Sequence, residues 1–216
     1  CDMHSNPEAI AAQETYLRDL VKHTNPYTGL AYKDDPSIVG FEINNEPCHS
    51  GTKEEVKAYI NRMLKSMSKA GNRKPVFYVS HNGYVAEAYY ETTVQGTTYQ
   101  WYPIGLVSGQ TQQGNFLPYV DRYDIPFAGK VKEFNKKARM IYEFDPADIM
   151  YSYMYPAMVR TFRTAGFQWI TQFAYDPIDL AFANTEYQTH FLNLAYTPNK
   201  AISMKIAAEA ARSLKR

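Results

Sequence analysis

The sequence predicts an α/β fold built on a parallel sheet, and two observations support this. Short apolar segments rich in β-branched and aromatic residues alternate with longer segments of helical periodicity. Such alternation favours either an open doubly wound sheet or a (β/α)₈ barrel with right-handed crossovers. No glycine-rich turn of the dinucleotide-binding kind follows an expected strand, which weakens the nucleotide-binding open sheet. Both architectures remain open on these observations alone.

The helices are predicted from their capping residues and apolar faces. Asn6 is an N-cap followed by Pro7 at the first helical position, and an apolar face continues to Val21. The segment 52–55, Thr-Lys-Glu-Glu, is a capping box that begins a second long helix, and Gly71 ends it. Further helical segments are expected over 85–90, 149–164 and 199–214, with a short helix at best over 131–137.

Five strands are expected, over 38–43, 75–80, 96–103, 139–143 and 167–173. The stretch 104–130 is weakly patterned and is interpreted as an elaborate loop. A closed barrel of this type needs eight strands, so the count of five falls short of a complete barrel within residues 1–216.

The composition excludes several classes of partner. The formal net charge is +1 with mixed charges, which gives no electrostatic reason to expect nucleic acid. No apolar stretch approaches the roughly 18–20 residues that span a bilayer, so no membrane is expected. Two cysteines, Cys1 and Cys48, leave the redox compartment open. The aromatic content of 15% suits a sugar-binding cleft and an ordinary core equally well.

Two glutamates carry the prediction of function. Glu46 ends the apolar run 37–47 and Glu143 ends the run 138–145. A carboxylate at the carboxyl end of a buried strand lies where active sites of parallel barrels collect. Two of them are typical of the acid/base and the nucleophile of a sugar hydrolase, whereas a capping or loop carboxylate is the alternative for each.

The surrounding motifs resemble those of a known group of enzymes. Segment 27–47, which ends in Asn-Glu-Pro, looks like the fourth-strand region of clan A glycoside hydrolases and is closest to family 5 mannanase- and cellulase-like enzymes. Segments 98–103, 141–144 and 166–169 resemble the sixth, seventh and eighth strands. The match implies a (β/α)₈ TIM barrel of which this chain supplies about the fourth to eighth βα units. The first three strands have no counterpart in it.

The resemblance assigns roles to individual residues. Glu46 is implied as general acid/base and Glu143 as nucleophile, with the Tyr102 hydroxyl bonded to the nucleophile and Asn45 donating to the sugar 2-hydroxyl. In a retaining enzyme the two carboxyls lie about 5–5.5 Å apart, whereas about 6.5–9.5 Å implies inversion. His81 ends the fifth strand of the family and either lines the cleft or lies in a turn.

Several positions keep more than one interpretation. Trp101 and Trp169 are sugar-stacking platforms or core residues, and Gln172 and Phe173 are further candidates for the aromatic floor. Gln100 stands where the family often has His.

Three polar features outside these motifs are also ambiguous. His49 is a subsite residue or lies in a surface loop. The Asp145 and Asp148 pair is a weak cation site or, preferably, a helix cap. The Lys-rich segment 130–137 is expected to be solvated.

The implied activity is a retaining β-glycoside hydrolase acting on β-mannan, β-glucan or related oligosaccharides, without cofactor or metal. The alternatives are a β-galactosidase-like exo-glycosidase of the same clan and a catalytically inactive carbohydrate-binding descendant or fragment. The expected partners are the carbohydrate and an earlier segment of the same protein that completes the barrel. The resemblance also suggests a secreted or periplasmic location.

Overall fold

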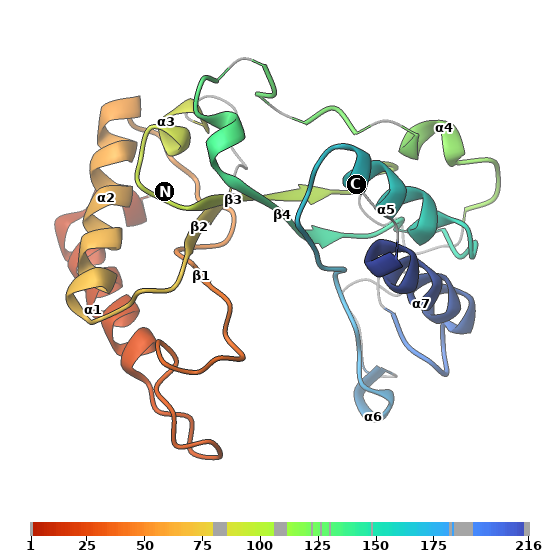
Figure 1. The fold of residues 1–216 in the computed structure, drawn as a ribbon, viewed down its shortest axis with the longest axis horizontal. Coiled ribbons are helices and arrows are strands. Elements are labelled where there is room, and N and C mark those ends of the chain that lie inside the picture. The colour runs from red at the N-terminus through yellow and green to blue at the C-terminus, as the bar shows by residue number, and fades with distance from the viewer. Residues whose placement is uncertain are drawn as a thin grey trace. The chain divides into compact units, whose positions relative to one another are not determined.

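The computed structural model describes residues 2–79, 86–105, 112–121, 123–125, 127–129, 131–147, 149–181, 183 and 192–213. Its sheet contains β1 (Phe41–Glu42), β2 (Val76–Val79), β3 (Gly96–Trp101), β4 (Ala138–Phe144) and β5 (Trp169–Ile170) (Figure 1). The strands follow one another in chain order, and the pairs β1–β2, β2–β3 and β4–β5 are parallel. A doubly wound sheet reverses its strand order at a switch point, so this order favours the barrel.

Helices separate the strands along the chain. The α-helices are α1 (Pro7–Lys22), α2 (Lys53–Lys69), α3 (Ala86–Tyr90), α4 (Leu117–Val120), α5 (Met154–Thr164), α6 (Ile178–Ala181) and α7 (Pro198–Ser213). Two short 3₁₀ segments, η1 (Asp2–His4) and η2 (Phe134–Lys136), complete the described elements. The described helices include none that is both long and apolar enough to cross a bilayer.

The chain divides into two compact units. The first comprises Cys1–Thr98 and Pro126–Ala138, and the second comprises Tyr99–Ile125 and Arg139–Arg216. Strands β3 and β4 each begin in the first unit and continue in the second. Each unit has its own apolar core and is described by itself.

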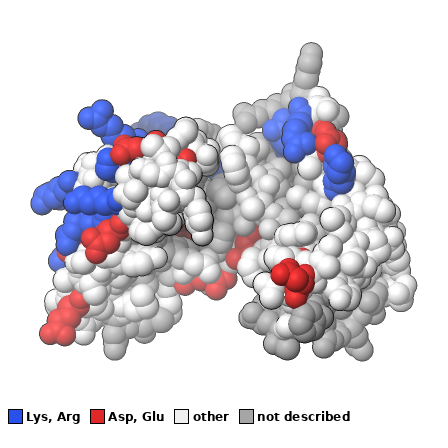
Figure 2. All heavy atoms as spheres, turned by 90° about the horizontal axis from the view of Figure 1, so that it is seen from below, with Lys and Arg blue, Asp and Glu red and all other residues white. Residues whose placement is uncertain are grey.

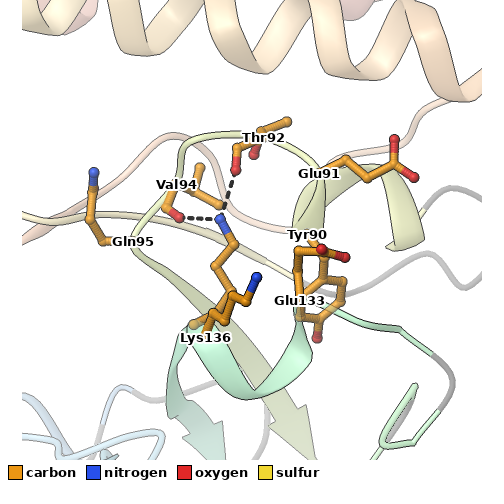
Figure 3. Close-up of a pocket in the computed structure, with 8 residues that line it drawn as sticks. Tyr90, Glu91, Thr92, Val94, Gln95, Glu133 and Lys136 are labelled. Atoms are coloured by element: carbon orange, nitrogen blue, oxygen red, sulfur yellow. Dashed lines mark hydrogen bonds between the residues drawn. The ribbon is translucent and has the colours of Figure 1, made fainter.

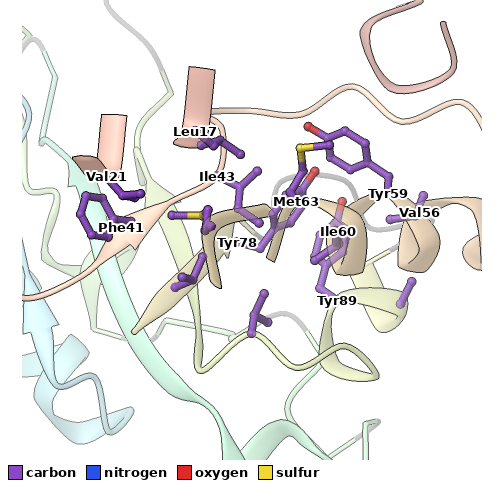
Figure 4. Close-up of a cluster of buried hydrophobic side chains, with 14 of the residues drawn as sticks. Leu17, Val21, Phe41, Ile43, Val56, Tyr59, Ile60, Met63, Tyr78 and Tyr89 are labelled. Carbon is purple, nitrogen blue, oxygen red and sulfur yellow. The ribbon is translucent and has the colours of Figure 1, made fainter. Parts of the chain in front are cut away.

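The first unit is organised around α1 and α2, which lie side by side (Figure 1). The Asn6 side chain accepts hydrogen bonds from two backbone N–H groups of the first turn of α1, and both bonds of the Thr52 capping box are present. The apolar faces of both helices meet the strands in a buried cluster (Figure 4). Its members include Leu17, Val21, Phe41, Ile43, Val56, Ile60, Met63 and Tyr78.

One glycine in the first unit is required by close packing. A Cβ atom at Gly96, the first residue of β3, would lie 2.2 Å from a ring carbon of Phe77 and 2.9 Å from the carbonyl oxygen of Ala138. The absence of a side chain therefore allows the Phe77 ring to cover the strand.

The second unit packs α5 and α7 together and over β4 and β5 (Figure 1). The Phe162 ring of α5 contacts the Phe144 ring at a centroid distance of 5.2 Å and the Phe167 ring at 5.8 Å, both edge to face. This aromatic core holds the carboxyl end of β4 against a helix.

Some elements differ from the expected bounds. Strands β1 and β5 pair over two residues only, and α5 begins at Met154 rather than Ile149. Tyr151 and Tyr153, in the non-helical stretch, stack on each other at 5.5 Å. Tyr151 also accepts a hydrogen bond from the Gly114 N–H. These contacts hold residues before α5 outside the helix. The short helices α4 and α6 were not predicted.

Charged side chains form a mixed surface. Figure 2 shows Lys and Arg beside Asp and Glu on the side of the first unit where α1 and α2 lie. Ion pairs such as Arg62 with Glu14 and Lys57 with Glu54 contribute to this pattern, which agrees with the small net charge.

Candidate functional site

The Glu143 carboxylate lies near the end of β4 and is held by two donors of the second unit. The Tyr102 hydroxyl donates to Oε1 in a short hydrogen bond, and the Gln100 side-chain amide donates to Oε2 over 2.9 Å. Both donors come from β3 or the residue following it. Hydrogen bonds to both oxygens fix the plane of the carboxylate. A carboxylate oriented in this way can act as a nucleophile.

The Tyr102 hydroxyl remains a donor. Burial raises the pKa of Tyr102 well above its ordinary value, and the hydrogen bond to Glu143 raises it further. The expected contact between Tyr102 and Glu143 is therefore present. Gln100, interpreted as a departure from the family pattern, contacts the same carboxylate.

The two tryptophans lie apart from this carboxylate. Trp101 packs on Phe162 of α5 at 5.1 Å and on Tyr123 at 4.8 Å, within the apolar core. Trp169 pairs with Met140, three residues before Glu143. Side chains alternate along a strand, so Trp169 projects from the face opposite Glu143.

Trp169 accordingly lines a groove with residues of α5 and α7 and is 49% exposed. The structure thus does not bring Trp169 to Glu143. The sugar-stacking role of both tryptophans stays a prediction.

Phe173 is the aromatic residue that the backbone brings towards the end of β4. Its N–H donates to the carbonyl oxygen of Phe144, and its side chain is 40% exposed. Among the floor candidates Trp169, Gln172 and Phe173, Phe173 is the aromatic residue whose backbone is hydrogen-bonded to the last residue of β4.

Asp145 does not cap a helix, which corrects the preferred prediction. It is fully buried and forms an ion pair with Lys200 of α7, Oδ2 to Nζ 2.9 Å. The residue predicted to share a site with it, Asp148, lies outside the described residues. Among the described residues, no group of three or more His, Cys, Asp or Glu side chains is arranged to hold a metal ion.

Glu46 belongs to the first unit and has an unusual backbone. Its φ is 44°, in the left-handed region that residues other than glycine rarely adopt, and its side chain is exposed. Such conformations persist where the surroundings impose them, and they cluster at functional sites. The neighbouring Asn45 is also exposed. Because Glu46 and Glu143 belong to separate units, the short separation expected of a retaining pair stays a prediction.

The residues on either side of Asn45 and Glu46 are tied to a polar cluster. Asn44 donates to Nε2 of His4 over 3.3 Å and to the Tyr59 hydroxyl over 2.9 Å. His49 is 6% exposed, and its Nε2 lies 2.6 Å from the Tyr78 hydroxyl. The surface-loop interpretation of His49 is therefore wrong.

Sequence reasoning missed the His4–His49 pair, because their 4.1 Å ring contact joins segments 45 positions apart. The predicted site residue His81 lies outside the described residues.

A separate pocket lies at the amino ends of β3 and β4 (Figure 3). Lys137, half-buried, donates to the carbonyl oxygens of Thr92 and Val94 over 2.7 and 2.6 Å, so its predicted solvated state is corrected. Burial lowers the pKa of Lys137. Glu143 lies near the carboxyl end of the same strand, β4, and barrel active sites form at carboxyl ends. The pocket is therefore at the wrong end of the strands for the predicted chemistry.

Comparisons with known proteins agree with this arrangement. No protein-family model matches the chain. A 94-residue region is 29% identical to mannan endo-1,4-beta-mannosidase 2 of Oryza sativa subsp. japonica and covers 42% of this chain and 20% of that protein. The structure is similar to a family 5 mannosidase from Rhizomucor miehei, with a TM-score of 0.70 at 14% identity, over 99% of this chain and 62% of that one. The chain resembles family 5 glycoside hydrolases.

The structure is also similar to that of the endo-beta-1,4-mannanase from Thermotoga petrophila. Its TM-score is 0.70 at 14% identity, over 98% of this chain and 52% of that one. The fold is thus the (β/α)₈ barrel, of which this chain supplies a five-stranded part. It spans between about half and two thirds of these solved chains and a smaller share of the rice enzyme.

Proposed function

We propose that the protein carrying this chain is a retaining β-glycoside hydrolase, with β-mannan as the leading substrate. The observation that carries the proposal is the Glu143 carboxylate, fixed at a strand end by Tyr102 and Gln100. Mannan is placed ahead of β-glucan because the similar proteins reported above are mannanases and a family 5 mannosidase by name.

The reaction proceeds by two displacements. A Glu143 oxygen forms a bond to the anomeric carbon while the glycosidic bond breaks, and Glu46 donates its proton to the leaving oxygen. Glu46 then takes a proton from water, whose oxygen displaces the Glu143 carboxylate from the anomeric carbon. Two donors on Glu143 suit the first step, because they hold the attacking carboxylate in one orientation.

Two variants test the roles. Glu143→Gln is expected to abolish formation of the glycosyl-enzyme. Glu46→Ala is expected to spare aryl β-mannosides with good leaving groups, which need no protonation, and azide is expected to rescue its second step. Equal loss of activity in both variants on every substrate would contradict the assignment. Binding of mannan oligosaccharides without any turnover would instead favour the alternative of an inactive carbohydrate-binding protein.

We also propose that strands outside these 216 residues complete the barrel. The described sheet has five strands where a closed barrel has eight, and β1 and β5 stand at the ends of its order. Open strand edges recruit other strands. Residues 1–216 expressed alone are therefore expected to aggregate or associate, and a cooperative monomeric thermal transition would argue against this completion.

A further inference from the structure

A buried ion pair lies immediately beyond the proposed nucleophile. Asp145, two residues after Glu143, is 0% exposed, and its partner Lys200 is 1% exposed. The Tyr155 hydroxyl of α5 donates to Asp145 Oδ1 in a short hydrogen bond, and the Gln172 amide donates to the same oxygen over 3.3 Å. The Asp145 carboxylate is thus held by three side chains from separate parts of the second unit.

Stability is a poor explanation for this pair. Desolvating two charges costs several kcal/mol per ion, and replacing a buried pair by apolar residues of similar size is often neutral or stabilising. Lys200 also lies in the first turn of α7, where the positive end of the helix dipole disfavours a cation. The pair therefore adds little net stability, and the geometry that it imposes is the more informative property.

That geometry concerns the end of β4. Lys200 anchors α7 to the residue that follows the strand, while Tyr155 anchors α5 to it. The turn before α7 is itself fixed, because the buried Asn193 side chain accepts from two backbone N–H groups and donates to the carbonyl of Asp176. Lys200 therefore approaches Asp145 from a rigid support.

We infer that Lys200 is a positioning residue for Glu143, acting through Asp145; this inference rests on the proposed function. Lys200 is too deeply buried to contact a bound substrate, and its ammonium group pairs with a carboxylate two residues from the nucleophile. Replacing the lysine removes the ammonium group that faces the buried Asp145 carboxylate, and the strand end is then expected to shift to reduce the cost. A displacement of about 1 Å at a reacting group lowers the rate about 100-fold.

The test uses the complete protein and the double variant Asp145→Asn/Lys200→Met. It removes both charges but keeps an acceptor for Tyr155 and Gln172, so a melting temperature close to that of the parent is expected. The matched control is Lys205→Met, which removes an exposed lysine paired with Glu209 on the same helix.

The first readout is covalent labelling of Glu143 by a 2-deoxy-2-fluoro aryl β-mannoside, followed by mass spectrometry. Labelling by Lys200→Met is expected to be about 100-fold slower than labelling by the parent. The folded double variant is expected to remain at least about 10-fold slower, and Lys205→Met to match the parent. Labelling of the double variant at the parental rate would overturn the inference. It would show that the pair serves only to balance its own charges.

The second readout needs no turnover. The Tyr102 hydroxyl proton, bonded to Glu143, is observed by ¹H NMR and assigned by its loss in Tyr102→Phe. We expect this resonance to shift in the double variant and to stay in place in Lys205→Met. An unchanged resonance overturns the positioning role. A parent that is never labelled overturns the proposed function instead, while the resonance still decides the role of Lys200.

Discussion

The acid sensitivity of the first unit follows from the surroundings of His49. The imidazole contacts the rings of His4, Tyr59, Tyr78 and Tyr89, and the open side of the cluster is lined by Glu55 and Arg62. Burial, together with the smaller effect of the neighbouring His4, lowers the pKa of His49 from 6.5 to about 4. The folded protein therefore keeps His49 neutral at a pH where the unfolded chain protonates it.

The sign and size of the effect follow from proton linkage. Between about pH 6.5 and pH 4 the unfolded state binds more protons than the folded state, so the free energy of unfolding falls as the pH falls. A pKa difference of about 2.5 corresponds to about 3 kcal/mol of unfolding free energy. This contribution is fully present above the window and is lost as the pH falls through it. Burial also lowers the pKa of His4, which adds a loss of the same sign.

Urea unfolding of the protein and of His49→Gln between pH 4 and 7.5 measures this loss. Gln retains a polar partner for the Tyr78 hydroxyl but does not titrate, so the variant is expected to lose less stability on acidification by about 2–3 kcal/mol. His23→Gln, at an exposed histidine after α1, is the control and should retain the parental slope. Identical pH dependence in the protein and in His49→Gln would refute the reasoning.

Three further outcomes are expected, each measured by urea unfolding. Gly96→Ala is expected to destabilise the protein by about 1–3 kcal/mol, because the new methyl group overlaps the Phe77 ring; an unchanged midpoint would contradict the close approach. Glu46→Gly is expected to be more stable than Glu46→Ala by about 1 kcal/mol, because glycine adopts positive φ without strain; the opposite order would exclude the left-handed backbone. Thr52→Ala should cost about 1 kcal/mol through loss of the cap, whereas Thr28→Ala in an exposed turn serves as the comparison.

The features predicted best from sequence are those decided by neighbouring residues. Asn6 and Thr52 cap α1 and α2 where expected, because a capping side chain bonds to backbone groups within three residues. The five strands were also located, because apolar, β-branched runs are recognisable over short segments. The contact between Tyr102 and Glu143 could be predicted only from the family resemblance.

The features that sequence could not give depend on distant partners. The Asp145–Lys200 pair joins residues 55 positions apart, and nothing in the local pattern distinguishes Lys200 from a solvated lysine. The short lengths of β1 and β5 reflect hydrogen bonding to neighbours rather than propensity. Trp169 lies on the face of the sheet that the helices cover, and this placement follows from the strand register. A short apolar run does not specify that register.

The two proposed catalytic carboxylates lie in contrasting local environments. Glu143 is half-buried and hydrogen-bonded at both oxygens, which suits a group that must attack along one direction. Glu46 is exposed on a left-handed backbone that follows Asn44 and Asn45, which suits a group that exchanges protons with a leaving oxygen and then with water. Pairs of carboxylates divide their roles through such differences of environment. This difference in surroundings therefore favours Glu143 as the nucleophile. If the roles were exchanged, the nucleophile would be exposed and the acid would be held by two hydrogen-bond donors.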